Sequence, residues 1–162
     1  MSFLQTKHSD PVIHLAFDPS PLGGSVAVLL SNRTIDFWNG VDGSQKSKSL
    51  LGSIRFVLCK ILICNRSLEN VVKEPRQVIW AAQNTLFVLS FNHQVNSDQL
   101  HVVVFDNDYK TIESINLVPL PMGISGISRL IFDVPSNTVA IQSNSGVLFE
   151  GTLLATSNHS SQ

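Results

Sequence analysis

The sequence predicts an all-β fold made of β-propeller blades. A unit of three short strands separated by turns recurs three times, at a period of roughly 40 to 60 residues that is typical of such blades. The third strand of each unit ends in an aromatic residue followed by Asn, Asp or Glu, at Trp38-Asn39, Phe105-Asp106 and Phe149-Glu150. The 162 residues are 43% hydrophobic and 14% charged with a net charge of -1, which excludes a disordered chain.

The first unit contains three predicted strands, at residues 12–17, 26–30 and 34–39. They are rich in Val, Ile, Leu and Phe, which favour the pleated backbone of a sheet. Pro, Ser and Gly at 18–24 indicate the first turn. Asn32 is the residue of the second turn that can adopt the left-handed conformation at modest cost.

The second and third units repeat this order. Their predicted strands lie at residues 77–80, 86–90, 101–106, 128–132, 138–141 and 146–150. Gly146 suits the left-handed position of the last hairpin turn. Because successive side chains of a strand point to opposite faces, we expect every second residue of the central strands to be buried. These residues are Val28, Leu30, Phe87, Leu89, Val139 and Ile141.

The chain is too short for a closed propeller, since even four blades need about 160 to 180 residues without long loops. We therefore predict a partial propeller of about two to three blades, at 8–74, 75–124 and an incomplete 125–154, followed by a polar tail at 155–162. The flanks of the first and last sheets should expose apolar residues and promote aggregation or oligomerisation. These flanking residues are Leu15, Phe17, Leu130 and Phe132.

Three remaining segments are predicted from composition. Residues 40–53 and 92–99 are rich in Gly, Ser and Asn and are expected to form exposed loops. The apolar segment 54–64 is interrupted by Arg55 and Lys60 and is shorter than the roughly 20 residues that a spanning helix needs. It is expected to be a strand packed between two layers. With no signal peptide at its start, the chain is expected to be cytoplasmic, with a nuclear location as an alternative.

Catalytic chemistry is not indicated anywhere. Cys59 and Cys64 are five residues apart, which matches no zinc signature and indicates buried thiols. The five histidines show no metal-ligand spacing, and His14 and His101 are expected to be hydrogen-bonded or solvent-facing strand residues. Gly123-Ile124-Ser125-Gly126 precedes a strand rather than a helix, so it indicates a turn instead of a phosphate site. We predict no catalytic residue, no metal, no cofactor and no enzymatic activity.

Positive charge is concentrated in one part of the chain. The basic residues there, opposed only by Glu69 and Glu74, are Lys46, Lys48, Arg55, Lys60, Arg66, Lys73 and Arg76. Such a cluster can contact RNA phosphates or an acidic partner. No aromatic residues alternate with the basic ones to stack bases, so a solvated surface is the simpler interpretation.

Several segments resemble known families. Residues 8–19 resemble the start of a WD-repeat blade, and the three aromatic-polar pairs resemble degenerate Trp-Asp endings. Residues 25–38, then Val78-Ile79-Trp80 before 86–90, then 126–149 resemble in their order the second propeller of the Elongator complex protein 1 family. The segment 40–74 has no counterpart in this resemblance, so no family role is carried onto the basic cluster.

This resemblance implies a non-catalytic scaffold in Elongator, the cytoplasmic complex that modifies the wobble uridine of certain tRNAs. The implied partners are the other Elongator subunits and, indirectly or through the basic cluster, tRNA; no membrane is implied. Family members form homodimers through a C-terminal region that this sequence does not contain. Two alternatives stay open from the residues alone: a WD-repeat-like module for protein-protein interaction in another complex, and an RNA-binding platform.

Overall fold

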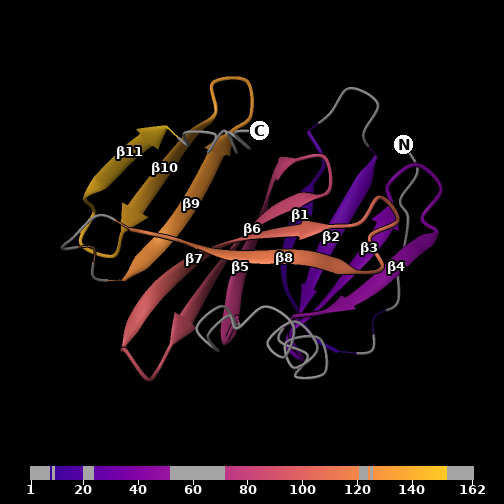
Figure 1. The fold of residues 1–162 in the computed structure, drawn as a ribbon, viewed down its shortest axis with the longest axis horizontal. Coiled ribbons are helices and arrows are strands. Elements are labelled where there is room, and N and C mark those ends of the chain that lie inside the picture. The colour runs from indigo at the N-terminus through magenta and orange to yellow at the C-terminus, as the bar shows by residue number, and fades with distance from the viewer. Residues whose placement is uncertain are drawn as a thin grey trace, which may run out of the picture.

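The structure is all-β, as predicted. This computed structural model describes residues 8, 10–19, 24–51, 72–120, 124 and 126–152. The described residues form eleven strands in three antiparallel sheets, and Figure 1 shows sheet 1 in indigo to purple, sheet 2 in pink to orange and sheet 3 in orange to yellow. No helix in this part of the chain is long and apolar enough to cross a membrane. The segment 54–64 lies outside the described residues.

Sheet 1 has four strands in sequence order. They are β1 (Val12–Phe17), β2 (Ser25–Leu30), β3 (Thr34–Asn39) and β4 (Gln45–Leu50). The strand β4 corrects the prediction of a loop at 40–53. Its sequence is polar because it is the outermost strand of the sheet, and its pairing with β3 prevails over its weak intrinsic preference for a strand.

Sheet 2 also has four strands, and sheet 3 has three. Sheet 2 consists of β5 (Glu74–Ala82), β6 (Thr85–Asn92), β7 (Ser97–Phe105) and β8 (Ile112–Val118). Sheet 3 consists of β9 (Ile127–Asp133), β10 (Thr138–Ser143) and β11 (Leu148–Thr152). The predicted loop at 92–99 is too long, because β6 and β7 extend into it on both sides and leave a turn at 93–96. The strand β8 was not predicted.

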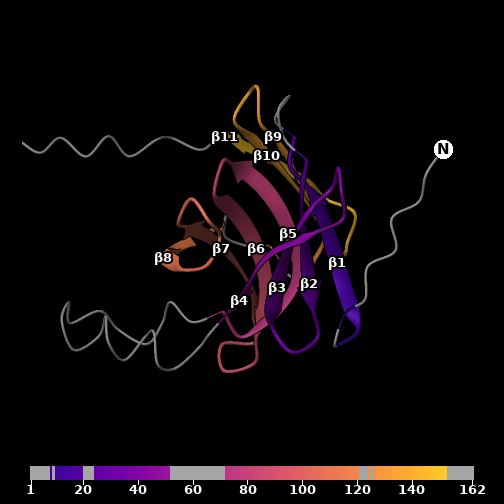
Figure 2. The same cartoon turned by 90° about the vertical axis from the view of Figure 1, so that its right-hand side faces the viewer.

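The first strand of each sheet lies at the inner edge. The strand β1 contacts β5, and β5 contacts β9, so the three inner strands follow one another while the later strands of each sheet spread outward (Figures 1 and 2). Sheet 2 therefore stands between the other two. This arrangement of sheets around a shared inner edge is that of propeller blades.

Aromatic side chains fill the space between sheets 1 and 2. Phe37 from β3 lies fully buried at the centre of this core. Its ring stacks on Tyr109 with centroids 4.6 Å apart and meets Phe105 edge to face at 5.0 Å and Trp80 at 6.1 Å. Aromatic pairs at these separations contribute beyond their buried area.

A second core lies between sheets 2 and 3, and β6 takes part in both. Leu86 and Val88 of β6 belong to the first core, whereas Phe87 and Leu89 belong to the second. All six residues predicted to be buried in the central strands are buried, and Leu86 and Val88 on the other face of β6 are buried as well. Leu130 and Phe132, however, pack against sheet 2 rather than being exposed, because β9 is not a free flank on that side.

The turns confirm one prediction and correct another. Gly146 has a φ of 84°, the left-handed conformation expected of it. In the β2–β3 turn the left-handed residue is Arg33, with a φ of 67°, and not Asn32. The Asn32 side chain instead accepts a hydrogen bond from the Thr34 backbone N–H at 2.9 Å, which closes the turn from outside.

Candidate functional site

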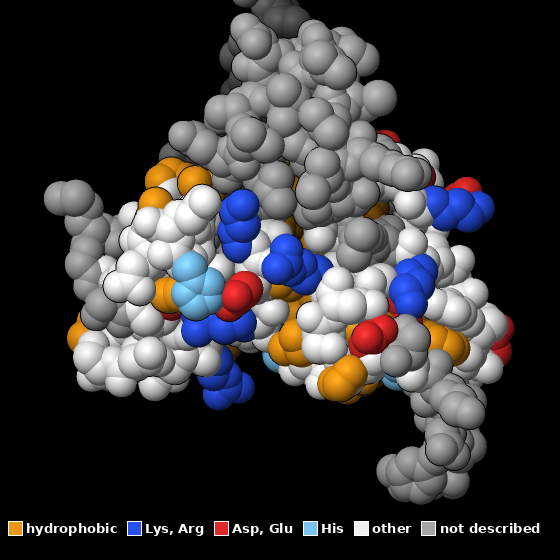
Figure 3. All heavy atoms as spheres, turned by 90° about the horizontal axis from the view of Figure 1, so that it is seen from below, with side chains coloured by type: hydrophobic (Ala, Val, Ile, Leu, Met, Phe, Trp, Pro, Cys, Tyr) orange, Lys and Arg blue, Asp and Glu red, His pale blue; other side chains and the backbone are white. Residues whose placement is uncertain are grey.

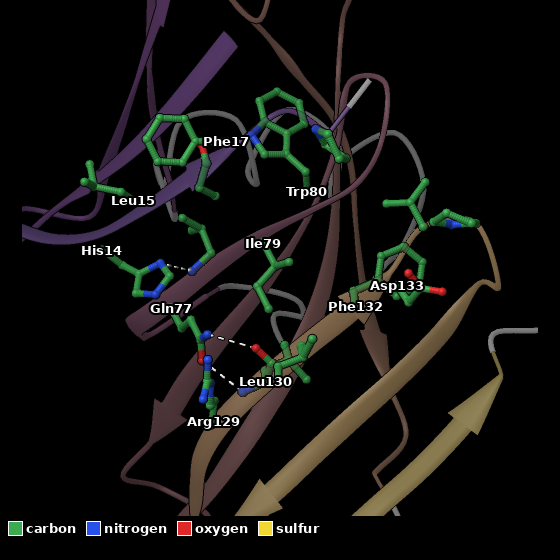
Figure 4. A pocket seen from close by; sticks show the side chains of 16 residues that line it. His14, Leu15, Phe17, Gln77, Ile79, Trp80, Arg129, Leu130, Phe132 and Asp133 are labelled. Carbon is green, nitrogen blue, oxygen red and sulfur yellow. Dashed lines mark hydrogen bonds between the residues drawn. The ribbon is translucent and has the colours of Figure 1, made fainter. Parts of the chain in front are cut away.

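A groove runs along the inner strands of the three sheets. It has a volume of about 440 Å³ and is lined by residues of β1, β5, β9 and the turns that follow β1 and β9. In Figure 4, Ile79 of β5 lies at the centre, with His14 of β1 on one side and Phe132 of β9 on the other. All three side chains are half-buried, so each presents part of its surface to the groove.

Side-chain hydrogen bonds hold the walls of the groove. The Gln77 amide donates to the Leu130 carbonyl at 3.0 Å and accepts from the Leu130 N–H at 3.2 Å. It thereby pairs with β9 as a backbone peptide would. On the other side, the Trp80 indole N–H donates to the Ala16 carbonyl at 3.0 Å. These bonds join β5 to both neighbouring sheets and fix the width of the groove.

The groove is apolar at its centre and polar around it. Ile79 and Phe132 pack against the second core, and the Phe132 ring meets Phe87 edge to face at 5.0 Å. Arg129 and Asp133, four residues apart on β9, are exposed. A mainly apolar concave surface with few polar groups is the usual composition of a binding site.

His14 is the titratable group in the wall formed by β1. Burial lowers the pKa of His14. The Val78 N–H lies 3.5 Å from His14 Nδ1, so the proton of the neutral ring is on Nε2. His14 therefore offers the groove one neutral hydrogen-bond donor.

The predicted basic cluster does not line this groove. Lys46 and Lys48 lie on β4, where the Lys46 Nζ donates to Ser25 Oγ at 2.8 Å and the Lys48 Nζ lies 3.8 Å from Asp36 Oδ1. Lysines on an outermost strand also oppose edge-to-edge pairing with other chains. Figure 3 shows a face on which basic side chains stand apart with acidic ones between them.

The other members of the cluster are also away from the groove or undescribed. Arg76 on β5 forms an ion pair with the buried carboxylate of Asp98, and Lys73 precedes β5. Arg55, Lys60 and Arg66 lie outside the described residues. Contact of this cluster with RNA or an acidic partner stays a prediction.

Elements of a catalytic site are not assembled in the described residues. They contain no group of three or more His, Cys, Asp or Glu side chains that could hold a metal ion. The Ser90 hydroxyl lies 3.4 Å from His101 Nδ1, but both residues are completely buried. A serine in such a place cannot reach a substrate from solvent.

Sequence patterns did not predict the groove residues. Residues 77–80 were predicted as a strand, but nothing singled out the tether made by Gln77 or the central place of Ile79. The one available signal is a polar Gln at the start of an otherwise apolar strand, which is too common to indicate a role. The groove arises from three segments far apart in the sequence.

Comparison with known proteins supports the fold alone. The sequence matches no protein-family model and no curated protein. The structure is similar to the WD40 domain of coronin from Toxoplasma gondii, with a TM-score of 0.53 and 9% identity over 85% of this chain and 30% of that chain. It is also similar to a chain of the mitotic checkpoint complex, with a TM-score of 0.56 and 12% identity over 92% of this chain and 38% of that one.

These similarities confirm the predicted fold class. The three sheets correspond to blades of a WD40-type β-propeller, and the chain spans less than two fifths of the length of each of these two chains. The described fold is thus a partial propeller.

Proposed function

We propose that this chain is a non-catalytic, protein-binding propeller module that holds an extended segment of a partner protein in the groove along β1, β5 and β9. Propellers position loops and strand ends rigidly, which suits binding and scaffolding. The observation that carries the proposal is the groove centred on Ile79, with an apolar floor and polar groups on both sides.

The groove favours a particular kind of segment. Arg129 and Asp133 are four residues apart on β9, which at a rise of about 3.3 Å per residue separates them by about 13 Å. An extended peptide laid along β9 would place an acidic side chain near Arg129 and a basic one near Asp133, with an apolar side chain over Ile79 between them. Opposite charges at the two ends would also fix the direction of the peptide.

Selection of short random peptides on the immobilised 162-residue chain tests this proposal. The affinity of the selected peptide is measured by calorimetry for the wild type and for the variants Ile79→Lys and Arg129→Glu. We expect each variant to bind about tenfold more weakly, a loss of about 1.4 kcal/mol. The lysine stem at position 79 can reach solvent, so the fold should tolerate it.

Lys110→Glu is the matched control, because Lys110 is exposed in the turn between β7 and β8 and is not a groove residue. It should bind the peptide as the wild type does. Equal affinity for the wild type and both groove variants would place binding elsewhere and refute the proposal.

The sequence resemblance extends this proposal to a specific complex. We infer that the module belongs to a scaffold subunit of the Elongator complex protein 1 (IKAP) type, in the cytoplasm, where other Elongator subunits would be its partners and tRNA the substrate of the complex. The order of the resembling segments and the WD40-type fold support this inference. A module of another complex is the alternative.

Affinity purification of the tagged chain from its native cell distinguishes these two. Recovery of Elongator subunits, reduced by Arg129→Glu and unchanged by Lys110→Glu, would support the Elongator assignment. Recovery of a different complex with the same dependence on Arg129 would support the alternative. Recovery only with ribosomes or membranes would contradict both.

A further inference from the structure

The inner strand of each sheet has one edge that pairs with no other strand. In the described part of the chain, β1 pairs only with β2, β5 only with β6 and β9 only with β10. The backbone N–H and C=O groups of alternate residues along each inner strand therefore point away from its sheet. Since these three strands line the groove, it offers peptide groups to a ligand as well as side chains.

The pairing of β9 with β10 shows which residues of β9 present these groups. Opposite residues of an antiparallel pair alternate between exchanging both backbone hydrogen bonds and exchanging neither. Leu130 lies opposite Ile141, and its N–H and C=O both bond to the Gln77 side chain instead. Phe132 is two residues farther along and lies opposite Val139. The N–H and C=O of Phe132 therefore also point to the unpaired edge.

The Gln77 side chain shows how this edge binds a peptide group. A carboxamide has the same kind of donor and acceptor as a backbone peptide. Figure 4 shows the Gln77 amide reaching from β5 to the backbone of Leu130, with both hydrogen bonds drawn. Within the described residues, the backbone of Phe132 has no such partner across the groove. One further peptide group can therefore bind there.

The binding position on β9 is one residue long. On one side of it, Leu130 is already bonded to Gln77. On the other side, the next residue of this edge is Val134, whose carbonyl accepts a hydrogen bond from the Asn137 N–H at 3.2 Å in the turn after β9. A segment bound along β9 is thus limited to two backbone hydrogen bonds, both with Phe132.

We propose that the partner segment lies antiparallel to β9 and that one of its residues, termed residue X, exchanges both backbone hydrogen bonds with Phe132. This inference rests on the proposed function, because it states how the groove holds the segment. Every described strand pair of this chain is antiparallel. Antiparallel pairing is also slightly more stable per residue than parallel pairing.

This pairing determines the side chains that the segment needs. Directly opposite residues of an antiparallel pair point to the same face. Residue X therefore points with Phe132 toward sheet 2, where it lies over Ile79. The residue before X lies opposite Asp133, and the third residue after X lies opposite Arg129. From its N-terminus, the segment is thus a basic residue, an apolar residue X, any two residues and an acidic residue.

Backbone N-methylation of the peptide selected on the wild-type chain is the first test. A methyl group on the nitrogen of residue X removes the donor to the Phe132 carbonyl, so the affinity should fall at least about tenfold. The matched control carries the methyl group on the next residue, whose N–H points away from β9. That peptide should bind as the unmodified one does. Unchanged affinity after methylation at X would overturn the proposal.

The order of the side chains is the second test. Calorimetry compares a peptide containing Lys-Leu-Ser-Ser-Glu between glycine spacers with one containing the same residues in reverse order. The first should bind about tenfold more tightly, because only its direction places Lys near Asp133 and Glu near Arg129 in an antiparallel segment. Tighter binding of the reversed peptide would indicate a parallel segment and refute the proposed direction.

A pair of variants tests the same hydrogen bonds from the protein side. Phe132→Pro removes the N–H, which takes no part in the pairing with β10, so proline is compatible with this edge. Phe132→Ala is the matched control, because it loses the same ring and keeps the N–H. Circular dichroism verifies the fold of both. The proline variant should bind the peptide about tenfold more weakly than the alanine variant, and equal affinities would contradict the proposal.

The outcomes separate this inference from the proposed function. Binding that depends on Ile79 and Arg129 but not on N-methylation at X would keep the groove as the binding site and refute the backbone pairing alone. Binding that depends on none of these changes would refute both.

Discussion

The buried carboxylate of Asp98 accepts a hydrogen bond from the backbone N–H of Ile127, and so joins sheet 2 to the first residue of sheet 3. The same carboxylate pairs with Arg76 on β5. One side chain on β7 therefore connects the inner strand of its own sheet to the inner strand of the next. Because carboxylates in such positions are both desolvated and hydrogen-bonded, their removal leaves unpaired donors behind.

Replacing Asp98 by Ala should destabilise the chain. The Ile127 N–H would lose its acceptor, and we expect the free energy of unfolding to fall by about 2 kcal/mol. Urea unfolding followed by Trp fluorescence measures this change. Asp108→Ala, at a side chain that is 75% exposed, is the control and should change stability by less than about 0.5 kcal/mol. Equal stability of the two variants would show that the Asp98 contacts do not hold the sheets together.

Truncating Phe37 should have a larger effect, because its ring contacts three other aromatic rings in the first core. We expect Phe37→Ala to lower the free energy of unfolding by about 3 to 5 kcal/mol. Near-ultraviolet circular dichroism should lose intensity in parallel. Val41→Ala, at an exposed residue of the β3–β4 turn, should leave both measurements unchanged. A small effect at Phe37 would mean that the aromatic cluster is not the centre of this core.

The stability of the chain should fall in mild acid because of His101. Burial lowers the pKa of this histidine from 6.5 to about 4. Between these two values the unfolded chain binds a proton that the folded chain does not, so stability decreases as pH falls through this window. The full effect is about 3 kcal/mol, from a difference of about 2.5 pH units. Burial of His14 acts in the same direction.

Thermal melts from pH 7 to pH 4 measure this dependence. His101→Gln should flatten it. If His101→Gln melts with an unchanged pH dependence, another group must be responsible for it.

The RNA-binding alternative makes its own prediction for the basic cluster. If Lys46 and Lys48 contact phosphates, tRNA affinity should fall steeply with salt, and the double variant Lys46→Glu, Lys48→Glu should reduce the slope of that dependence by about two. Filter binding across a range of salt concentrations measures both quantities. Lys110→Glu supplies a control with the same type of substitution outside the cluster. Equal slopes for the cluster variant and the wild type would exclude these two lysines as RNA contacts.

The sequence predicted the strands that form the cores better than the strands at the outside. Strands such as β2 and β6 are almost continuous apolar runs, so their burial could be predicted. The strand β4 could not, because Gln45–Leu50 is polar and is ordered by its pairing with β3. Leu130 was predicted to be exposed, because the sequence of a single strand does not show which other sheet packs against it.

The groove was beyond prediction for a related reason. His14, Gln77 and Leu130 are far apart along the chain, and their contacts depend on the order in which the sheets stack. The charge pattern drew attention to the basic residues, but composition says nothing about which cations are already paired. Asp36 and Asp98, which engage Lys48 and Arg76, are visible only in the folded chain.

Because both faces of β6 are buried, only certain changes to the sequence of this strand are compatible with the fold. A strand with one solvent-exposed face keeps its pairing register, because a shift by one residue would turn its polar side chains toward the core and its apolar ones toward solvent. In β6 such a shift exchanges one apolar set for another, so hydrophobicity does not oppose it. The register is instead held by the tight turns at its ends, where Asn84 and Asn96 have φ values of 60° and 48°. Exchanges among Val, Ile and Leu in β6 should therefore be accepted, whereas the gain or loss of a single residue between these two asparagines should not.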